Sequence, residues 1–225
     1  MKSHKKSSDP VQAVLCSGGL DSAVLLGDLL RQGVRVFPLF IRCGLYWEKT
    51  ELGCLRRFLR AVRCDRLEPL TILDEPVANL YDEHWSITGQ NVPGADTPDE
   101  AVFLPGRNVL LLAKSLLWCH LHEVPALALG SLKGNPFPDA TPAFFDALQN
   151  VVNQAVEGHV VIHRPFAGMK KTEVVLLGKD LPLEHSLSCI RPIKGLHCGQ
   201  CNKCAERQLA FERVKVPDPT TYADS

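Results

Sequence analysis

The chain has 225 residues with 25 basic and 25 acidic side chains, so its formal net charge at neutral pH is zero. This length provides for one domain with a good core, or for a domain with a small appendage. The charge balance argues against a general nucleic-acid binder, and no run approaches the ~18 apolar residues of a membrane span. No long apolar segment follows the basic start, as a signal peptide would require, so we expect a cytoplasmic protein without membrane or nucleic-acid partners.

Apolar segments alternate with helical patterns in the first third of the chain. Residues 11–16, 34–41 and 67–73 are short apolar runs that predict buried strands, and residues 20–33 and 48–62 carry apolar side chains at helical spacing. This order predicts an α/β fold with a doubly wound parallel sheet and right-handed crossovers. Ligands of such sheets bind beyond the carboxyl ends of the strands.

Residues 74–102 interrupt this alternation. The segment is rich in proline, glycine and acidic residues, so we expect a long insertion, with a short helix around residues 77–85. Long loops in compact domains are usually functional or mobile. A lid and a disordered excursion both fit this composition.

The remainder of the chain returns to the alternating pattern. The expected elements are helices at about 107–122, 142–156 and 171–177 and strands at 126–130 and 160–163. We therefore divide the chain into a main domain at 11–185 and a cysteine-containing C-terminal region at 186–213. The flanking segments 1–10 and 216–225 are expected to be flexible tails.

A glycine-containing loop, Ser-Gly-Gly-Leu-Asp-Ser at residues 17–22, follows the first strand. A strand that leads through such a loop into a helix N-terminus forms an anion site, because backbone N–H groups point outward and the helix dipole favours negative charge. The two glycines let the backbone approach a phosphate, and Asp21 adds an acceptor able to hold hydrated Mg²⁺. An ordinary strand–turn–helix with a serine cap is the alternative.

Four of the nine cysteines lie within sixteen residues: Cys189, Cys198, Cys201 and Cys204. Two-residue gaps let neighbouring thiolates turn onto one ion, as tetrahedral Zn²⁺ requires, and four ligands favour a structural role over a catalytic one. An iron–sulfur cluster is the rival, because the same short spacing occurs in ferredoxins. Four unrelated thiols are the remaining alternative. In a chain without export features, this usage favours reduced thiols.

The loop at 17–22, the stretch Pro-Gly-Arg-Asn at 105–108, the pair Lys171 and Glu173 and the four cysteines occur in this order. In that combination the chain resembles the 7-cyano-7-deazaguanine synthases, the QueC family of queuosine biosynthesis within the PP-loop ATP pyrophosphatases. The resemblance covers about residues 11–208. It implies a fold like that of the adenine nucleotide alpha hydrolases and a ligase that forms C–N bonds. Such an enzyme adenylates the carboxylate of 7-carboxy-7-deazaguanine and uses ammonia to make the amide and then the nitrile, preQ0.

The resemblance also implies roles for individual residues. Asp21 would position Mg²⁺, Lys171 would offset charge on the α-phosphate, and Ser22 would help to hold the departing pyrophosphate. The implied ATP-binding residues are Cys16, Ser17, Gly18, Gly19, Leu20, Asp21, Ser22 and Arg107. The implied substrate-binding residues are Arg107, Asn108, Phe137 and Asp139. A structural zinc ion and a homodimer, common among relatives, complete the expectation.

Two stretches depart from the family pattern. Residues 44–48 are Gly-Leu-Tyr-Trp-Glu where relatives carry a Gln-Arg-His-like stretch before a glutamate, and Glu51 is the nearest match. Residues 137–141 are Phe-Pro-Asp-Ala-Thr where relatives have Tyr-Pro-Asp-Cys-Arg, so an arginine that could face a substrate carboxylate is missing.

Three alternatives to the synthase therefore stay open. The first is a divergent relative that stops at the amide or joins the adenylated deazapurine acid to another amine. The second is a PP-loop tRNA-thiolation enzyme, which needs a reactive cysteine near the loop, with Cys16 as the candidate. The third is a zinc-binding module without enzymatic activity.

Overall fold

A computed structural model describes residues 10–223, so residues 1–9 of the expected tail 1–10 and residues 224–225 of the expected tail 216–225 lie outside the described residues. The described strands form one parallel sheet in the order β3-β2-β1-β4-β5. The strands are β1 (Val11–Leu15), β2 (Arg35–Arg42), β3 (Thr71–Asp74), β4 (Ala126–Ala128) and β5 (Val161–His163). The chain moves outward from β1 to β3 and then returns to the other side for β4 and β5. This order confirms the doubly wound sheet and places its reversal between β1 and β4.

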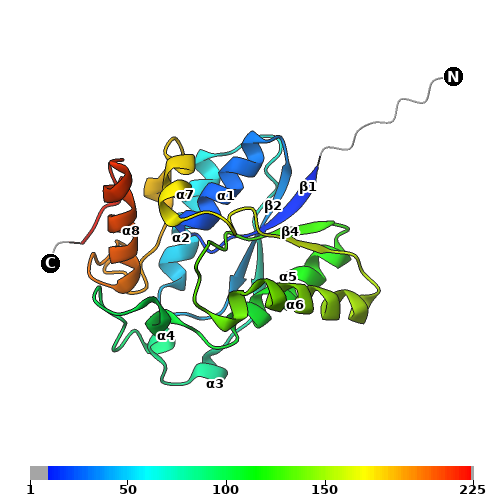
Figure 1. The fold of residues 1–225 in the computed structure, drawn as a ribbon, viewed down its shortest axis with the longest axis horizontal. Coiled ribbons are helices and arrows are strands. Elements are labelled where there is room, and N and C mark those ends of the chain that lie inside the picture. The colour runs from blue at the N-terminus through cyan, green and yellow to red at the C-terminus, as the bar shows by residue number, and fades with distance from the viewer. Residues whose placement is uncertain (1–9, 224–225) are drawn as a thin grey trace.

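Helices cover both faces of the sheet (Figure 1). One layer consists of α1 (Leu20–Arg31), α2 (Glu48–Ala61), α7 (Lys171–Gly178) and α8 (Asn202–Val214), and the other of α5 (Arg107–Leu121) and α6 (Pro142–Val156). The neighbouring residues Ala13 and Val14 of β1 are both fully buried, each in the apolar cluster of a different layer. This is the burial expected of a strand enclosed by helices on both faces. None of the described helices combines the length and apolar character needed to cross a lipid bilayer.

The segment at 74–102 contains two short helices, α3 (Ala78–Tyr81) and α4 (Trp85–Thr88), and a 3₁₀ turn at Asp99–Val102. Its Trp85 ring stacks on Trp47, with 5.7 Å between ring centroids. At its other end, the Asn202 side-chain amide donates a hydrogen bond of 2.8 Å to the carbonyl of Thr97. The segment therefore connects the loop after β2 with the cysteine region, along the lower edge of Figure 1.

Helix α8 was not among the elements predicted from the sequence. Its buried face carries Cys204, Arg207 and Phe211, at spacings of three and four residues, and Phe211 belongs to the same apolar cluster as the core of α1. The fully buried Arg207 donates to Ser186 Oγ at 2.8 Å and to Asp218 Oδ1 at 3.3 Å. Asp218 lies in the segment expected to form the C-terminal tail, so part of that segment packs against the cysteine region.

Candidate active site

The loop between β1 and α1 lies at the point where the strand order reverses, which is where ligands of open α/β sheets bind. Gly18 has a φ of +75°, and a Cβ there would lie 2.7 Å from the carbonyl oxygen of Glu51, so this position requires glycine. No side chain caps α1 at Gly19. The first-turn N–H groups of α1 are therefore available to an anion. The hydroxyl oxygens of Ser17 and Ser22 lie 3.3 Å apart beside them.

A cavity of about 400 Å³, the large lobe, opens in front of this loop, and a second of about 240 Å³, the small lobe, adjoins it. The lining residues shared by the two lobes are Ser17, Asp21, Glu51, Arg107, Gly130, Ser131 and Asn135. The small lobe also has an apolar lining that includes Leu15, Ile41 and Leu111. An apolar pocket with a few polar groups suits a planar organic ligand.

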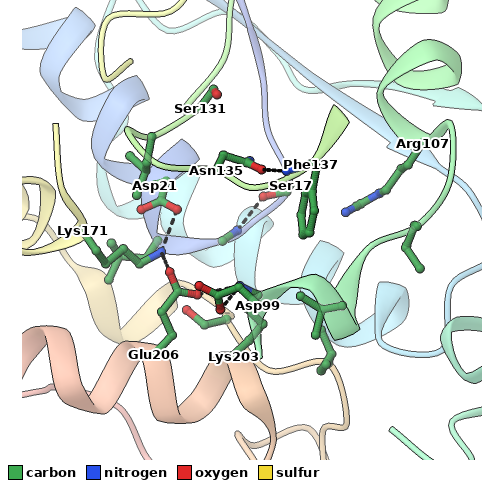
Figure 2. Close-up of a pocket in the computed structure, with 18 of the residues that line it drawn as sticks. Ser17, Asp21, Asp99, Arg107, Ser131, Asn135, Phe137, Lys171, Lys203 and Glu206 are labelled. Carbon is green, nitrogen blue, oxygen red and sulfur yellow. Dashed lines mark hydrogen bonds and ion pairs between the residues drawn. The ribbon is translucent and has the colours of Figure 1, made fainter. Parts of the chain in front are cut away.

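A chain of alternating charges runs along one wall of the large lobe (Figure 2). Lys171 Nζ lies 2.7 Å from Asp21 Oδ2 and 3.6 Å from Glu206 Oε1. Lys203 Nζ lies 2.8 Å from Glu206 Oε2 and 3.8 Å from Asp99 Oδ1. Burial raises the pKa of Glu206, but the charges of Lys171 and Lys203 outweigh it and bring the pKa to about 2. For Lys171 burial acts to lower the pKa, but the negative charges of Asp21 and Glu206 outweigh burial, and the pKa is raised. Glu206 and Lys171 are therefore both charged at neutral pH.

Two polar atoms of this site are buried without a hydrogen-bond partner among the described residues, Asp21 Oδ1 and Arg107 Nε. Such atoms are costly unless a ligand or ion satisfies them. Arg107 lies across the cavity from the charge chain, with its guanidinium directed into the open space (Figure 2). The site thus offers a free carboxylate oxygen on one side and a free guanidinium N–H on the other.

Most of the site residues predicted from the sequence meet in these lobes. They are Cys16, Ser17, Gly19, Leu20, Asp21, Ser22, Arg107, Asn108, Phe137 and Lys171. Gly18 is not among the lining residues; it lies where the loop passes close to the backbone of Glu51, with no room for a Cβ. Asp139 is not among the lining residues of either lobe. Its Oδ2 accepts a hydrogen bond of 3.1 Å from the N–H of Asn108, in the first turn of α5. The carboxylate of Asp139 therefore serves as a helix cap.

Several lining residues were missed by sequence reasoning. Trp47 and Trp85 form an aromatic wall, and Lys203 and Glu206 come from α8. Glu206 carried no signal of its own, because its role depends on contacts with residues distant in the sequence. Trp85 lies in the 74–102 segment, where no element other than the short helix was expected.

Cys16 is the cysteine nearest the loop, and it is 2% exposed. Burial raises the pKa of its thiol to about 12. A nucleophilic cysteine needs a thiolate and an accessible sulfur. Cys16 therefore lacks the properties that a sulfur-transfer enzyme would need at this position.

The four clustered cysteines are buried and their sulfur atoms lie within 4.8 Å of one another. Cys189 Sγ and Cys201 Sγ are 3.9 Å apart, and Cys198 Sγ and Cys204 Sγ are 4.0 Å apart. Four thiolates around one tetrahedral ion, at the Zn–S distance of about 2.3 Å, would be separated by about 3.8 Å. The N–H of Cys198 donates to Cys189 Sγ at 3.3 Å, as backbone groups do around bound thiolates. The cluster is thus arranged to bind one metal ion.

Comparisons with known proteins agree with this geometry. The family model for queuosine biosynthesis protein QueC matches residues 12–215. The chain is 33% identical to the 7-cyano-7-deazaguanine synthase of Methanopyrus kandleri over 227 residues, which cover 94% of this chain and 98% of that protein. It is 32% identical to the enzyme of the same name from Solidesulfovibrio magneticus, with 94% and 95% covered.

Among solved structures, a 4-thiouridine synthetase in complex with RNA and ATP aligns with a TM-score of 0.53 at 20% identity, over 92% of this chain and 51% of that one. The U34-tRNA thiolase NcsA from Methanococcus maripaludis, described with its [4Fe-4S] cluster, aligns with a TM-score of 0.50 at 13% identity, over 92% and 68%. At such identities the likeness concerns the fold alone. It confirms the PP-loop, adenine nucleotide alpha hydrolase-like fold predicted from the sequence.

Proposed function

Because the chain belongs to the QueC family, we propose that it is an ATP-dependent ligase that forms C–N bonds on a 7-deazapurine acid. The proposed reaction converts 7-carboxy-7-deazaguanine and ammonia to 7-cyano-7-deazaguanine, with two molecules of ATP. The observation that carries this proposal is the two-lobed cavity in front of the uncapped N-terminus of α1, flanked by the Asp21–Lys171 ion pair at 2.7 Å.

The two lobes suit the two substrates of such a reaction, ATP and the deazapurine acid. In the proposal the apolar small lobe takes the adenosine, and the first turn of α1, with Ser17 and Ser22, holds the phosphates that leave as pyrophosphate. Lys171 offsets the charge that builds on the α-phosphate while the substrate carboxylate attacks it. The Asp21–Glu206 pair fixes the ammonium of Lys171 for this task.

The large lobe would hold the deazapurine acid. Trp47, Trp85 and Phe137 line it with flat aromatic surfaces that suit a planar heterocycle. The free guanidinium of Arg107 is the partner for the substrate carboxylate, which compensates for the arginine that is missing at residue 141. Asn108 and Asp139 act indirectly, because their mutual hydrogen bonds fix the start of the helix that carries Arg107.

Two metal ions belong to the proposal. Asp21 Oδ1 is a buried acceptor without a partner among the described residues, and carboxylate oxygens are ligands that Mg²⁺ prefers, so Asp21 fits a magnesium ion that arrives with ATP. When bound, this ion would neutralise phosphate charge. The close spacing of the four cysteine sulfurs favours a single structural Zn²⁺ over an iron–sulfur cluster, whose thiolates lie farther apart. Thiolate ligands must stay reduced, so the proposed compartment is the cytoplasm.

The test is incubation of the protein with ATP, Mg²⁺, ammonia and 7-carboxy-7-deazaguanine, followed by mass spectrometry. We expect AMP and pyrophosphate in equal amounts and the nitrile as the final product. Accumulation of the amide would reassign the protein as a ligase that stops after one round. AMP formation that does not depend on the acid would refute the proposed substrate. Light scattering in the same buffer tests the homodimer that the family implies.

A further inference from the structure

Four carboxyl groups line the large lobe: Asp21, Glu51, Asp99 and Glu206. Three of them are ion-paired with lysines, Asp21 with Lys171 and both Asp99 and Glu206 with Lys203. Glu51 is the exception, because none of the ion pairs in the described part of the chain involves it. A carboxylate paired with lysine is held as the anion, whereas an unpaired carboxyl group can exchange a proton. Glu51 is therefore the acid of this wall that is free to act in proton transfer.

Glu51 also occupies the junction of the two lobes, since it lines both. It stands directly behind the phosphate loop, with its Cγ 3.0 Å from the position that a Cβ on Gly18 would take. The other titratable residues that line both lobes are Asp21, which is engaged by Lys171, and the cation Arg107. The junction is where a group attached to the α-phosphate must meet an incoming nucleophile, if the small lobe holds the adenosine.

The surroundings of Glu51 set its proton affinity. The residue is 8% exposed, and burial raises its pKa to about 8. The charge of Arg107 on α5 and a hydrogen bond from the side chain of Trp47 oppose this rise, and the charge of Glu48 adds to it. The thiols of Cys43 and Cys54 also face this carboxyl group, and their own pKa values are raised, foremost by burial. A group with a pKa close to the working pH is suited to general acid–base catalysis.

We propose that Glu51 is the catalytic base of the amide-forming step, which accepts the proton that ammonia loses on attack. This inference rests on the proposed function. The nitrogen attacks the carbonyl carbon of the acyl adenylate, and the C–O bond to the phosphate oxygen breaks with its electron pair staying on AMP. The surplus proton on nitrogen passes to the Glu51 carboxylate and then to solvent.

The preceding adenylation does not need this base, because its nucleophile is already a carboxylate anion. In its protonated form Glu51 carries no charge, so it does not repel the phosphates or the substrate anion at the junction. Glu51 should therefore matter for amide formation and not for acyl adenylate formation. That separation makes the inference testable.

The experiment compares the two half-reactions in Glu51→Gln, which keeps the size of the side chain. Adenylation is measured as acid-dependent exchange of labelled pyrophosphate into ATP, and amide formation by mass spectrometry. We expect exchange close to that of the unchanged enzyme and amide formation reduced about 10²–10⁴-fold, the usual contribution of general acid–base catalysis. Glu212→Gln is the control, because Glu212 is an exposed glutamate on α8 that lines neither lobe. This control should retain both half-reactions.

The pH profile of product formation gives a second readout. Hydroxylamine replaces ammonia as the nucleophile in this assay, because it is already unprotonated over the pH range that is measured. The reaction rate of the wild-type enzyme should rise with pH through about 8. Glu51→Asp should be slower but show the same pH dependence, and Glu51→Gln should show no such dependence. Equal losses of exchange and amide formation in Glu51→Gln would show a structural role and overturn the inference. Full amide formation in this variant, or an unchanged pH profile, would overturn it as well. Absence of acid-dependent exchange in the unchanged protein would instead refute the proposed function, and the inference with it.

Discussion

Replacement of Glu206 by glutamine removes the negative charge that lies between Lys171 and Lys203. Glu206 Oε1 is 3.6 Å from one ammonium nitrogen and Oε2 is 2.8 Å from the other. The variant keeps the side-chain size and one carbonyl oxygen, so it changes chiefly the electrostatics. Two lysines would then share one wall of the cavity with less compensating charge. We expect the folded state to lose stability at neutral pH.

The size of the loss follows from the pKa of Glu206, which lies at about 2 in the folded chain against an ordinary value of 4.5. Each pKa unit corresponds to 1.36 kcal/mol, so the charged form of Glu206 is stabilised by about 3 kcal/mol. The side chain is 31% exposed, and solvent screening reduces the expected effect to about 2 kcal/mol. Because the folded-state pKa is lowered, this stabilisation is complete above the unfolded-state pKa and is lost as the pH falls toward the folded-state value.

The assay is urea denaturation of the unchanged protein and Glu206→Gln at a series of pH values from 7 downward. The free energies of unfolding should differ by about 2 kcal/mol at pH 7, and the difference should shrink once the pH falls below 4.5. Glu212→Gln is the matched control, since Glu212 lies on the same helix and is exposed. A difference that stays constant with pH, or an equal loss in the control, would refute the electrostatic reasoning.

Two further pairs of substitutions, each a test variant with its control, probe the loop and the cysteines. Gly18→Ala and Gly44→Ala both place alanine at a positive φ, +75° and +80°, but only the Cβ at residue 18 meets backbone, at 2.7 Å. Both variants should lose about 1–3 kcal/mol of stability. Only Gly18→Ala should lose ATP binding, measured by calorimetry. Equal ATP affinity in the two variants would contradict the proposed loop geometry. Cys201→Ser should abolish metal binding in native mass spectrometry and lower the melting temperature, whereas Cys64→Ser, at an exposed cysteine, should retain the metal. A Cys201→Ser protein that folds equally well without metal would exclude a structural ion.

The sheet and the loop could be predicted because their signals are local. Each strand is a short apolar run and each helix has its own apolar stripe. The adjacent glycines indicate the conformation of the loop at 17–22. Where no residue marks the end of an element, the observed boundaries differ from the predicted ones by a few residues. The third strand, for example, was expected at 67–73 and is Thr71–Asp74. Within the site, Asp21 and Lys171 were linked only through the family resemblance. Their pairing at 2.7 Å spans 150 positions in the sequence, and no local pattern predicts it.

Asp139 and Glu51 show the limit of reasoning from residue type. Both are acidic residues in or close to stretches that depart from the family pattern, and only Asp139 was expected to contact substrate. In the structure, the carboxylate of Asp139 accepts a hydrogen bond from the N–H of Asn108 and so caps the start of α5. Glu51 has its backbone oxygen next to the loop glycine and lines both lobes of the cavity. The position of Asp139 and the role proposed for Glu51 both depend on burial and on hydrogen-bond partners, which are properties of the packed chain.

The cysteine cluster and the charged wall of the large lobe are joined by one helix, although they were predicted as separate regions. Helix α8 starts at Asn202, immediately after Cys201, and Cys204 lies in its first turn. Lys203 and Glu206 alternate with these ligands and face the large lobe. An ion bound by the cysteines would therefore fix the helical turn whose side chains hold Lys171 beside Asp21. A metal ion at this position would stabilise the fold and would also orient a lysine of the proposed reaction, so the proposed structural and catalytic roles meet in one helix.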